Sequence, residues 1–364
     1  MKKVLLLCAT SRSVRNFRMG LIDYLKRNGC EVVVCAFDNE NEEIIKSSGA
    51  KYITINAQNR SINPFSFGKL KKQYISLIKE EKPDVILTFV LKPNVYGAFA
   101  AKKVGFENIY SFVEGTGDVF INNSIKWKLI RKYVCLQYKK AFKISKRVFF
   151  LNKDDRAEFL KRGLLLSEKS ELIPGIGIDL NRFSFSPIEN KDSFLMVSRL
   201  LKTKGVIEYC EAAKIVKEKY PNAVFNLVGP EGTLTASDLQ PYIDNDIIKY
   251  HGATNDVRPY LGECGIYALP SYREGFSVSI MEAQATGRPV ITCDTNGTRD
   301  SVDVGENGFL VKVGSSEELA EKMIYFLENP DKVIEMGKNA RERAEKYYNQ
   351  NEINKRICQI TGVE

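Results

Sequence analysis

The stretch ALPSYREGFSVSIME, residues 268–282, decides the fold because it holds a strand, a turn and a helix in direct succession. The apolar run 265–269 predicts a buried strand that ends at Pro270-Ser271, and the apolar spacing that follows predicts a helix restarting at Glu274-Gly275. Such a unit directs the free N–H groups and the positive dipole end of the helix at whatever binds above the sheet. The stretch therefore predicts a phosphate site.

Two carboxylates, Glu274 and Glu282, flank this helix start. They cannot bind phosphate, because like charges repel, but they can accept hydrogen bonds from hydroxyl groups. A ligand with phosphate in the middle and hydroxyls at both ends, such as a nucleotide sugar, fits this arrangement. The alternative is an ordinary helix whose first turn carries a favourable acidic residue and whose second glutamate lies on a solvated face.

Length and composition predict a two-domain protein of the reducing cytoplasm. A chain of 364 residues is longer than one hydrophobic core usually grows. It has no apolar stretch of about 18 residues and begins directly with a strand pattern, so we expect neither a transmembrane helix nor a signal peptide. Eight cysteines without a C-x-x-C pair and a single histidine argue against a zinc site and for buried thiols.

Charge is unevenly distributed along the chain. Residues 1–183 hold 33 Lys and Arg against 18 Asp and Glu, a net charge of +15, whereas 184–364 hold 21 against 27, a net charge of −6. Only the first half is therefore expected to meet an anionic surface. Nucleic acid, anionic lipid and a solvated basic face without a partner all remain open at this point.

Residues 1–183 predict a first doubly wound domain. Strand 3–8, a polar turn at 9–13, helix 14–27 and strand 31–37 form a βαβ unit, which is right-handed and places the turn at the carboxyl edge of a parallel sheet. Further strands are expected at 51–55, 84–89, 107–112 and 147–151, with helices near 67–79, 94–103, 124–142 and 153–162.

A second α/β domain is expected at 184–345, after the Ile173-Pro174-Gly175 break. The helix at 346–364 is expected to pack back on the first domain. Strands are predicted at 194–197, 223–228, 247–250, 265–269, 290–293 and 309–311, and helices at 205–219, 257–263, 277–286 and 316–328. The fold class is thus α/β, with two doubly wound, Rossmann-like domains.

The spacing of Glu274 and Glu282, E-x7-E, resembles the donor half of the retaining glycosyltransferases of family 4, together with Arg199 and Lys204 upstream and the segments GTRD and GENG downstream. The resemblance is clear over residues 193–345 and looser elsewhere. It implies the GT-B architecture, with the two domains facing each other across a cleft. It also implies a UDP-sugar as co-substrate, with no cofactor and no bound metal.

The resemblance assigns roles to residues of the second domain. Arg199 and Lys204 match the cations that bind the diphosphate, Glu274 the acceptor of hydroxyls on the transferred sugar, and Glu282 the acceptor of ribose hydroxyls. The remaining donor-binding candidates act through their backbone and are His251, Gly252, Gly275, Phe276, Ser277 and Val278. The lone histidine is expected to be structural. The catalytic candidates are Arg199, Lys204, Glu274 and, in the first domain, Glu114.

In the first domain, many family members carry a histidine near the reacting sugar, where this chain has Glu114 in the loop FVEGTG, residues 112–117. Glu114 thereby becomes the candidate for holding a sugar hydroxyl or activating the acceptor, unless it merely caps a glycine-rich turn. The loop resembles a bacterial group that extends sugars carried on undecaprenyl diphosphate. The candidates for the acceptor and its lipid diphosphate are Arg15, Asn16, Arg18, Glu114, Gly115, Thr116 and Gly117.

Such an acceptor would explain the basic first half, which we expect to lie on the inner face of the cell membrane as a peripheral protein. Two segments combine basic and aromatic residues: Arg60, Phe65, Phe67, Lys69, Lys71 and Lys72; and Lys126, Trp127, Lys128, Arg131, Lys132, Lys139 and Lys140. The first donor expected is UDP-N-acetylgalactosamine and the second UDP-N-acetylglucosamine, in O-antigen or protein glycosylation. A nucleotide-sugar epimerase and a basic nucleic-acid-binding protein are the alternatives, although no nucleic-acid module is recognised.

Overall fold

The computed structural model describes residues 1–57, 64–116, 118–121 and 124–364. The chain forms two compact units, residues 1–176 with 351–364 (unit 1) and residues 177–350 (unit 2). The chain therefore passes from unit 1 to unit 2 between residues 176 and 177, whereas the sequence suggested a boundary between residues 183 and 184. The Ile178 N–H donates to the Tyr348 carbonyl at 2.7 Å, and the Gln350 N–H donates to the Ile178 carbonyl at 3.1 Å. These bonds tie residue 178 to the end of unit 2.

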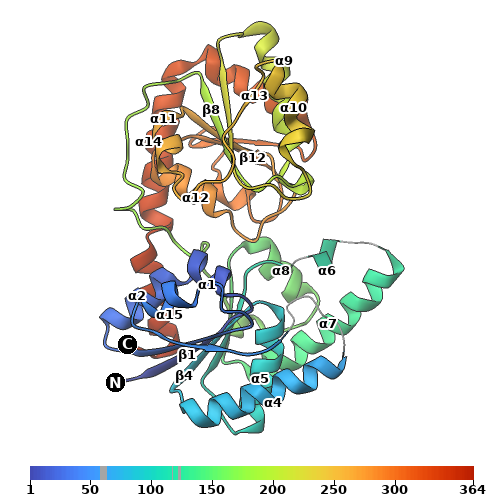
Figure 1. The fold of residues 1–364 in the computed structure, drawn as a ribbon, viewed down its shortest axis with the longest axis vertical. Helices are drawn as coiled ribbons and strands as arrows, with labels where there is room; N and C mark the ends of the chain where they lie inside the picture. The colour runs from blue at the N-terminus through green and yellow to red at the C-terminus, as the bar shows by residue number, and fades with distance from the viewer. Residues whose placement is uncertain (58–63, 117, 122–123) are drawn as a thin grey trace. The chain divides into compact units, whose positions relative to one another are not determined.

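Unit 1 is built on a parallel sheet of seven strands in the order β3-β2-β1-β4-β5-β6-β7. Its strands are β1 (Lys3–Leu7), β2 (Glu31–Ala36), β3 (Lys51–Thr54), β4 (Val85–Phe89), β5 (Ile109–Val113), β6 (Arg147–Phe150) and β7 (Ser170–Leu172). The central strands are apolar and buried along almost their whole length, as parallel strands covered on both faces must be. Figure 1 shows α4, α5 and α7 along one side of this sheet and α1, α2 and α15 along the other.

The helices of unit 1 include one break that the sequence pattern did not predict. The helix expected at 14–27 is two helices that meet at Arg18, whose φ of −124° interrupts the helical path. A π-helical turn, η1 (Pro93–Gly97), also follows β4. The elements are α1 (Ser11–Phe17), α2 (Met19–Arg27), α3 (Glu42–Lys46), α4 (Pro64–Glu81), η1, α5 (Ala98–Lys103), α6 (Asp118–Ile121), α7 (Ile125–Ile144), α8 (Lys153–Lys161), η2 (Ser167–Lys169) and α15 (Gln350–Thr361).

Unit 2 has a parallel sheet of six strands in the order β10-β9-β8-β11-β12-β13. The strands are β8 (Ser193–Val197), β9 (Val224–Val228), β10 (Lys249–Tyr250), β11 (Ile266–Leu269), β12 (Val290–Cys293) and β13 (Gly308–Val311). The helices are η3 (Lys202–Lys204), α9 (Val206–Lys219), α10 (Ala236–Asp244), α11 (Arg258–Glu263), α12 (Val278–Ala285), η4 (Arg299–Ser301), α13 (Ser316–Glu328) and α14 (Pro330–Tyr347).

Both sheets reverse their strand order at one point, between β1 and β4 in unit 1 and between β8 and β11 in unit 2. Doubly wound sheets bind ligands at the carboxyl ends of the strands that flank this switch point. In unit 2, β8 leads to Arg199 and Lys204, and β11 leads to Glu274. In unit 1, β1 leads to α1 and β4 to the π-helical turn. The strand order alone therefore selects the same segments of unit 2 that the sequence did.

Candidate functional site

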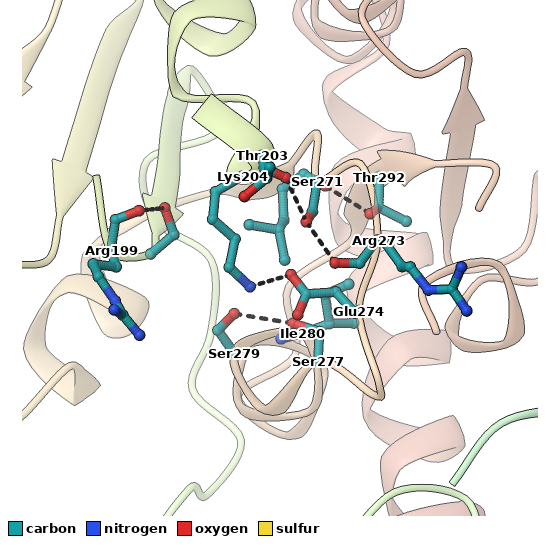
Figure 2. Close-up of polar contacts among 12 residues, drawn as sticks. Arg199, Thr203, Lys204, Ser271, Arg273, Glu274, Ser277, Ser279, Ile280 and Thr292 are labelled. Atoms are coloured by element: carbon teal, nitrogen blue, oxygen red, sulfur yellow. Dashed lines mark hydrogen bonds and ion pairs between the residues drawn. The ribbon is translucent and has the colours of Figure 1, made fainter. Parts of the chain in front are cut away.

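An ion pair between Lys204 and Glu274 lies at the switch point of unit 2. Figure 2 shows the Lys204 ammonium pointing at the Glu274 carboxylate, while the Arg199 guanidinium stands apart from the pair. The Glu274 side chain is only 12% exposed, so its charge is largely removed from water. The structure thus brings together two residues that are 70 positions apart in the chain. A cation and a carboxylate side by side can bind a phosphate and a hydroxyl of the same ligand.

The loop that carries Lys204 is fixed by its close approach to the end of β11. Gly205 has a φ of +74°, and a Cβ there would lie 2.1 Å from the Pro270 carbonyl oxygen, so only glycine fits. The Tyr272 N–H donates to the Thr203 carbonyl at 2.9 Å. These contacts fix the backbone on either side of Lys204, and the ion pair with Glu274 fixes the end of its side chain.

The loop that carries Glu274 rests on the turn after β12. The Glu274 N–H donates to the Asn296 carbonyl at 3.0 Å. Gly297, with a φ of +79°, approaches so closely that a Cβ there would lie 2.2 Å from the Glu274 carbonyl oxygen. Thr295 adds a hydrogen bond from its hydroxyl to the Tyr272 carbonyl at 3.0 Å. The segment TNGT, which includes the start of the GTRD motif, thus positions the Glu274 backbone.

The helix after this loop begins later than the sequence pattern suggested. Of the two helix starts that the sequence suggested, Glu274-Gly275 is wrong, whereas the range 277–286 agrees within a residue. α12 begins at Val278, with Ser277 as its N-cap accepting from the Ile280 N–H at 3.4 Å. Residues 274–276 form a loop, in which the Glu274 N–H bonds to the Asn296 carbonyl. Phe276 packs edge-on against Tyr348 with ring centroids 5.6 Å apart. Gly275, Phe276, Ser277 and Val278 consequently form the loop and first turn beside the ion pair.

Glu282 lies in the middle of α12 and is half-buried. Burial raises the pKa of its carboxyl to about 7, with the positive charge of Arg182 opposing the shift and the negative charge of Asp256 adding to it. A carboxyl with this pKa exchanges its proton near neutral pH. The ionised form, which is the stronger acceptor of hydrogen bonds from hydroxyls, predominates above that pH.

The other donor-binding candidates lie along the same edge of unit 2. Arg199 is exposed, and among the described residues its guanidinium has no hydrogen-bond or ion-pair partner. His251 follows β10, bonds to Asn226 Oδ1 through Nε2 at 2.8 Å and packs against Tyr260. Burial, then the charge of Lys249, lowers its pKa. The Gly252 carbonyl accepts from the Gly229 N–H at 2.8 Å. These contacts agree with a structural role for the histidine.

In unit 1 the structure pairs Arg18 with Glu114, and the Arg18 guanidinium also lies over the Phe89 ring, 4.2 Å from its centroid. Burial lowers the pKa of Arg18 to about 10. The charge of Arg18 is thus buried and engaged by Glu114 in this structure, and its contact with a lipid diphosphate stays a prediction. Sequence spacing could not show the pairing, because Arg18 lies on the break between α1 and α2.

The remaining acceptor candidates of unit 1 are not all gathered in one place. Gly115 has a φ of +143° and Thr116 is buried directly after Glu114. Arg15 and Asn16 are exposed on α1, and Arg15 contacts Asn41 Oδ1 at 3.5 Å. Gly117 lies outside the described residues, as does Arg60 of the first basic segment.

Two polar clusters at the switch point of unit 1 were missed by the sequence analysis. Ser11 bonds to the Asp38 carboxylate and accepts from Asn41, which closes the turn after β1. Buried Asn94 accepts from Thr88 at 2.7 Å and donates to the Phe112 carbonyl at 2.8 Å. The first cluster joins α1 to the loop after β2, and the second joins the π-helical turn to β4 and β5. Contacts between segments so far apart in the chain have no local sequence motif.

Within the described part of the chain, no three His, Cys, Asp or Glu side chains come close enough together to hold a metal ion. Over the same residues, every helix is too short or too polar to traverse a bilayer.

Known proteins resemble this chain along almost its whole length. Residues 3–147 match the model of the family described as Glycosyl transferase 4-like, and residues 178–343 match that of Glycosyl transferases group 1. The N,N'-diacetylbacillosaminyl-diphospho-undecaprenol alpha-1,3-N-acetylgalactosaminyltransferase of Campylobacter jejuni is 30% identical over 349 residues, which cover 92% of each chain. The UDP-Gal:alpha-D-GlcNAc-diphosphoundecaprenol alpha-1,3-galactosyltransferase of Escherichia coli is 30% identical over 78% of this chain and 76% of its own.

Solved structures support the fold. An Anabaena protein, HepE, in complex with UDP has a TM-score of 0.81 at 22% identity and covers all of both chains. A glycosyltransferase from Rickettsia africae has a TM-score of 0.81 at 20% identity, over 100% of this chain and 98% of its own. The prediction of two doubly wound, Rossmann-like domains of the GT-B class is confirmed, and the epimerase and nucleic-acid alternatives find no support. The chain belongs to the family 4 glycosyltransferases and is itself a glycosyltransferase.

Proposed function

We propose that this enzyme transfers N-acetylgalactosamine from UDP to a saccharide carried on undecaprenyl diphosphate, with retention of the anomeric configuration. The observation that carries the proposal is the Lys204–Glu274 ion pair at the switch point of unit 2, where a nucleotide sugar is expected. The relatives from Campylobacter jejuni and Escherichia coli support the acceptor class, because both are named for acceptors on diphospho-undecaprenol.

In this proposal, unit 2 binds the donor. Lys204 and exposed Arg199 neutralise the diphosphate, which lets the nucleotide leave without a divalent ion. Glu274 accepts hydrogen bonds from the transferred sugar, and its pairing with Lys204 orients the carboxylate in the absence of donor. Glu282 accepts from the ribose, and the backbone at His251 and Gly252 holds the base. The loop and first turn of α12, residues 275–278, hold phosphate and sugar oxygens.

Retention follows most simply if the acceptor hydroxyl attacks the face from which the diphosphate leaves. The bond from the anomeric carbon to the diphosphate oxygen breaks, the bond to the acceptor oxygen forms, and the leaving phosphate takes the hydroxyl proton. No protein nucleophile is then needed. Glu114 of unit 1 holds an acceptor or sugar hydroxyl in this scheme, and Arg18 fixes the direction of the Glu114 carboxylate.

We further propose that unit 1 lies on the inner face of the cell membrane through α7. Large apolar side chains are exposed along one side of this helix at a spacing of four, four and three residues: Ile125 at 79%, Leu129 at 66%, Tyr133 at 47% and Leu136 at 49%. α7 contains seven Lys and Arg and no Asp or Glu. An apolar stripe on a purely basic helix is typical of helices that lie in the headgroup region of anionic bilayers.

A turnover panel tests the proposed reaction. The purified enzyme is incubated in EDTA with each common UDP-sugar and GDP-sugar and with short polyprenyl-diphosphate sugars, and the lipid is analysed by mass spectrometry. We expect one N-acetylhexosamine to be added from UDP-N-acetylgalactosamine. Addition only from a GDP-sugar, or only when a divalent metal is restored, would contradict the proposal. If UDP-N-acetylglucosamine were the sole donor, the proposed donor site would stand, but the transferred sugar would be N-acetylglucosamine.

The site assignment is tested with Glu274→Gln, which keeps the size of the side chain and removes its charge. We expect the transfer rate to fall about 100-fold or more, because a group that stabilises the transferring sugar is worth that much in comparable sites. Glu306→Gln, an exposed residue of the same unit, is the matched control. Near-normal transfer by Glu274→Gln, with an unchanged melting curve, would remove Glu274 from the site.

A further inference from the structure

Unit 1 contains an open groove of about 970 Å³ that the proposed chemistry does not use. It lies where β5 and β6 begin, at the amino edge of the sheet, since Gly105–Glu107 and Lys146–Arg147 line it. Glu114 follows the other end of β5, so the groove and the acceptor candidate occupy opposite edges of the same sheet. Residues of α5, of the end of α7 and of α15 complete the wall.

The lining of the groove is cationic at the rim and apolar within. The apolar and aromatic side chains that line it are those of Phe99, Phe106, Tyr110, Ile144 and Ile360. Six cations surround them, namely Lys102, Lys140, Lys143, Lys146, Arg147 and Lys169, against the single carboxylate of Glu107. This combination fits a ligand that has both an anionic head and an apolar body.

Half of these cations have structural partners and half do not. Lys169 donates to the carbonyls of Lys143 at 2.9 Å and Ser145 at 2.8 Å, Lys146 bonds to Asn108 at 2.5 Å, and Arg147 lies 3.5 Å from Glu171. The exposed ammonium groups of Lys102, Lys140 and Lys143 contact no hydrogen-bond or ion-pair partner among the residues that the structure describes. These three lysines are therefore available to an external anion.

The groove lies on the same side of α7 as the exposed apolar stripe. Lys143 is 18 residues beyond Ile125, which is about five helical turns, so both point the same way. Lys140 is four residues beyond Leu136 and likewise continues the stripe. A helix that lies flat on a bilayer keeps this whole side at one depth. The mouth of the groove would then open at the level of the lipid phosphates.

We propose that the groove binds the phosphate head group of an anionic phospholipid, with Lys102, Lys140 and Lys143 around the phosphate and the aromatic floor against the glycerol and first acyl carbons. This inference rests on the membrane association proposed above and adds a specific lipid site to it. The enzyme would thereby be held on anionic bilayers in one orientation.

Two double variants of the full-length enzyme test the site. Lys102→Gln/Lys143→Gln removes two groove charges, and Lys103→Gln/Lys46→Gln removes two charges from exposed positions that do not line the groove. Flotation with phosphatidylcholine vesicles that contain phosphatidylglycerol measures binding. We expect the groove variant to bind roughly 25-fold more weakly, at about 5-fold for each lysine near a membrane surface. The control should lose clearly less, and an equal loss in both variants would overturn the site.

Calorimetric titration with dihexanoylphosphatidylglycerol, kept below its micelle concentration, separates the possible sources of the anion. We expect saturable binding by the wild-type enzyme and by the control, and none by the groove variant. Equal affinity for inorganic phosphate, or for an acidic peptide such as oligoglutamate, would overturn a lipid site. The groove variant should keep normal transfer to a short, water-soluble acceptor. If the wild-type enzyme itself transfers no sugar to that acceptor, the result counts against the proposed reaction. The lipid titration can still be interpreted, because it measures binding alone.

Discussion

At the scale of single residues, the site of unit 2 combines a carboxylate that is paired with a lysine and a carboxyl that titrates near neutral pH. Glu274 is paired with Lys204, whereas burial raises the pKa of Glu282 to about 7. The unfolded value is near 4.5, so between pH 4.5 and 7 the folded chain holds more protons at Glu282 than the unfolded chain. This residue therefore makes the free energy of unfolding fall as the pH rises through that window.

The same titration predicts a pH dependence of donor binding. A ribose diol donates to an ionised Glu282, so UDP should bind most tightly above pH 7 and lose close to tenfold in affinity per pH unit below it. Calorimetry of wild type and Glu282→Gln from pH 5 to 8.5 measures this. The diphosphate of UDP titrates equally with both proteins, so the difference isolates the carboxyl. Parallel profiles for the two proteins would contradict a ribose contact by Glu282.

At the scale of elements, the loops after β8, β11 and β12 hold one another in place. Gly297 lies where the turn after β12 meets the Glu274 backbone. We expect Gly297→Ala to reduce transfer at least tenfold, because the new methyl group must push the Glu274 carbonyl away from its place. Gly305→Ala is the matched control, since Gly305 also has a positive φ, +84°, but open space around it. Equal losses in the two variants would mean that backbone strain alone matters.

The elements also show what the sequence could and could not predict. Continuous apolar runs located most strands within a residue or two, because buried parallel strands are apolar on both faces. The start of a helix at Glu274-Gly275 was wrong because Asn296, whose carbonyl holds the Glu274 N–H in a loop, is 22 residues away. Helix α10 was missed although its capping box of Thr235 and Asp238 is visible in the sequence. The π-helical turn after β4 had no local signal.

The candidate site residues were likewise predicted only in part from the sequence. The roles of Arg199, Lys204, Glu274 and Glu282 were proposed from spacing and family resemblance, and the structure puts Lys204 against Glu274. Arg18 was expected at a diphosphate because its position on a helix near the sheet edge was all that the sequence offered. Its partner Glu114 lies 96 residues later, in the loop that follows β5. Pairings across the sheet of this kind depend on topology and have no local signature.

At the scale of the whole molecule, the chain leaves unit 1, builds unit 2 and returns with its last helix. The return of residues 346–364 was predicted, and residues 351–364 belong to unit 1 in the structure. Ile353, Ile357 and Cys358 of α15 are buried, and Asn354 donates to the Gly20 carbonyl at 3.1 Å. The last helix therefore completes the core of unit 1, although unit 2 separates it from that core in the sequence.

Truncation after Gln350 should consequently weaken unit 1 and spare unit 2. Loss of three buried apolar side chains costs about 4–6 kcal/mol, enough to lower the melting temperature of unit 1 by many degrees. Scanning calorimetry should show two transitions, of which the one raised by UDP belongs to unit 2, since a ligand stabilises the unit that binds it. We expect the truncation to shift only the other transition. Removal of Val363-Glu364 alone is the control, with a small effect. A shift of the UDP-sensitive transition by the same amount would mean that the two units unfold together and that α15 supports both.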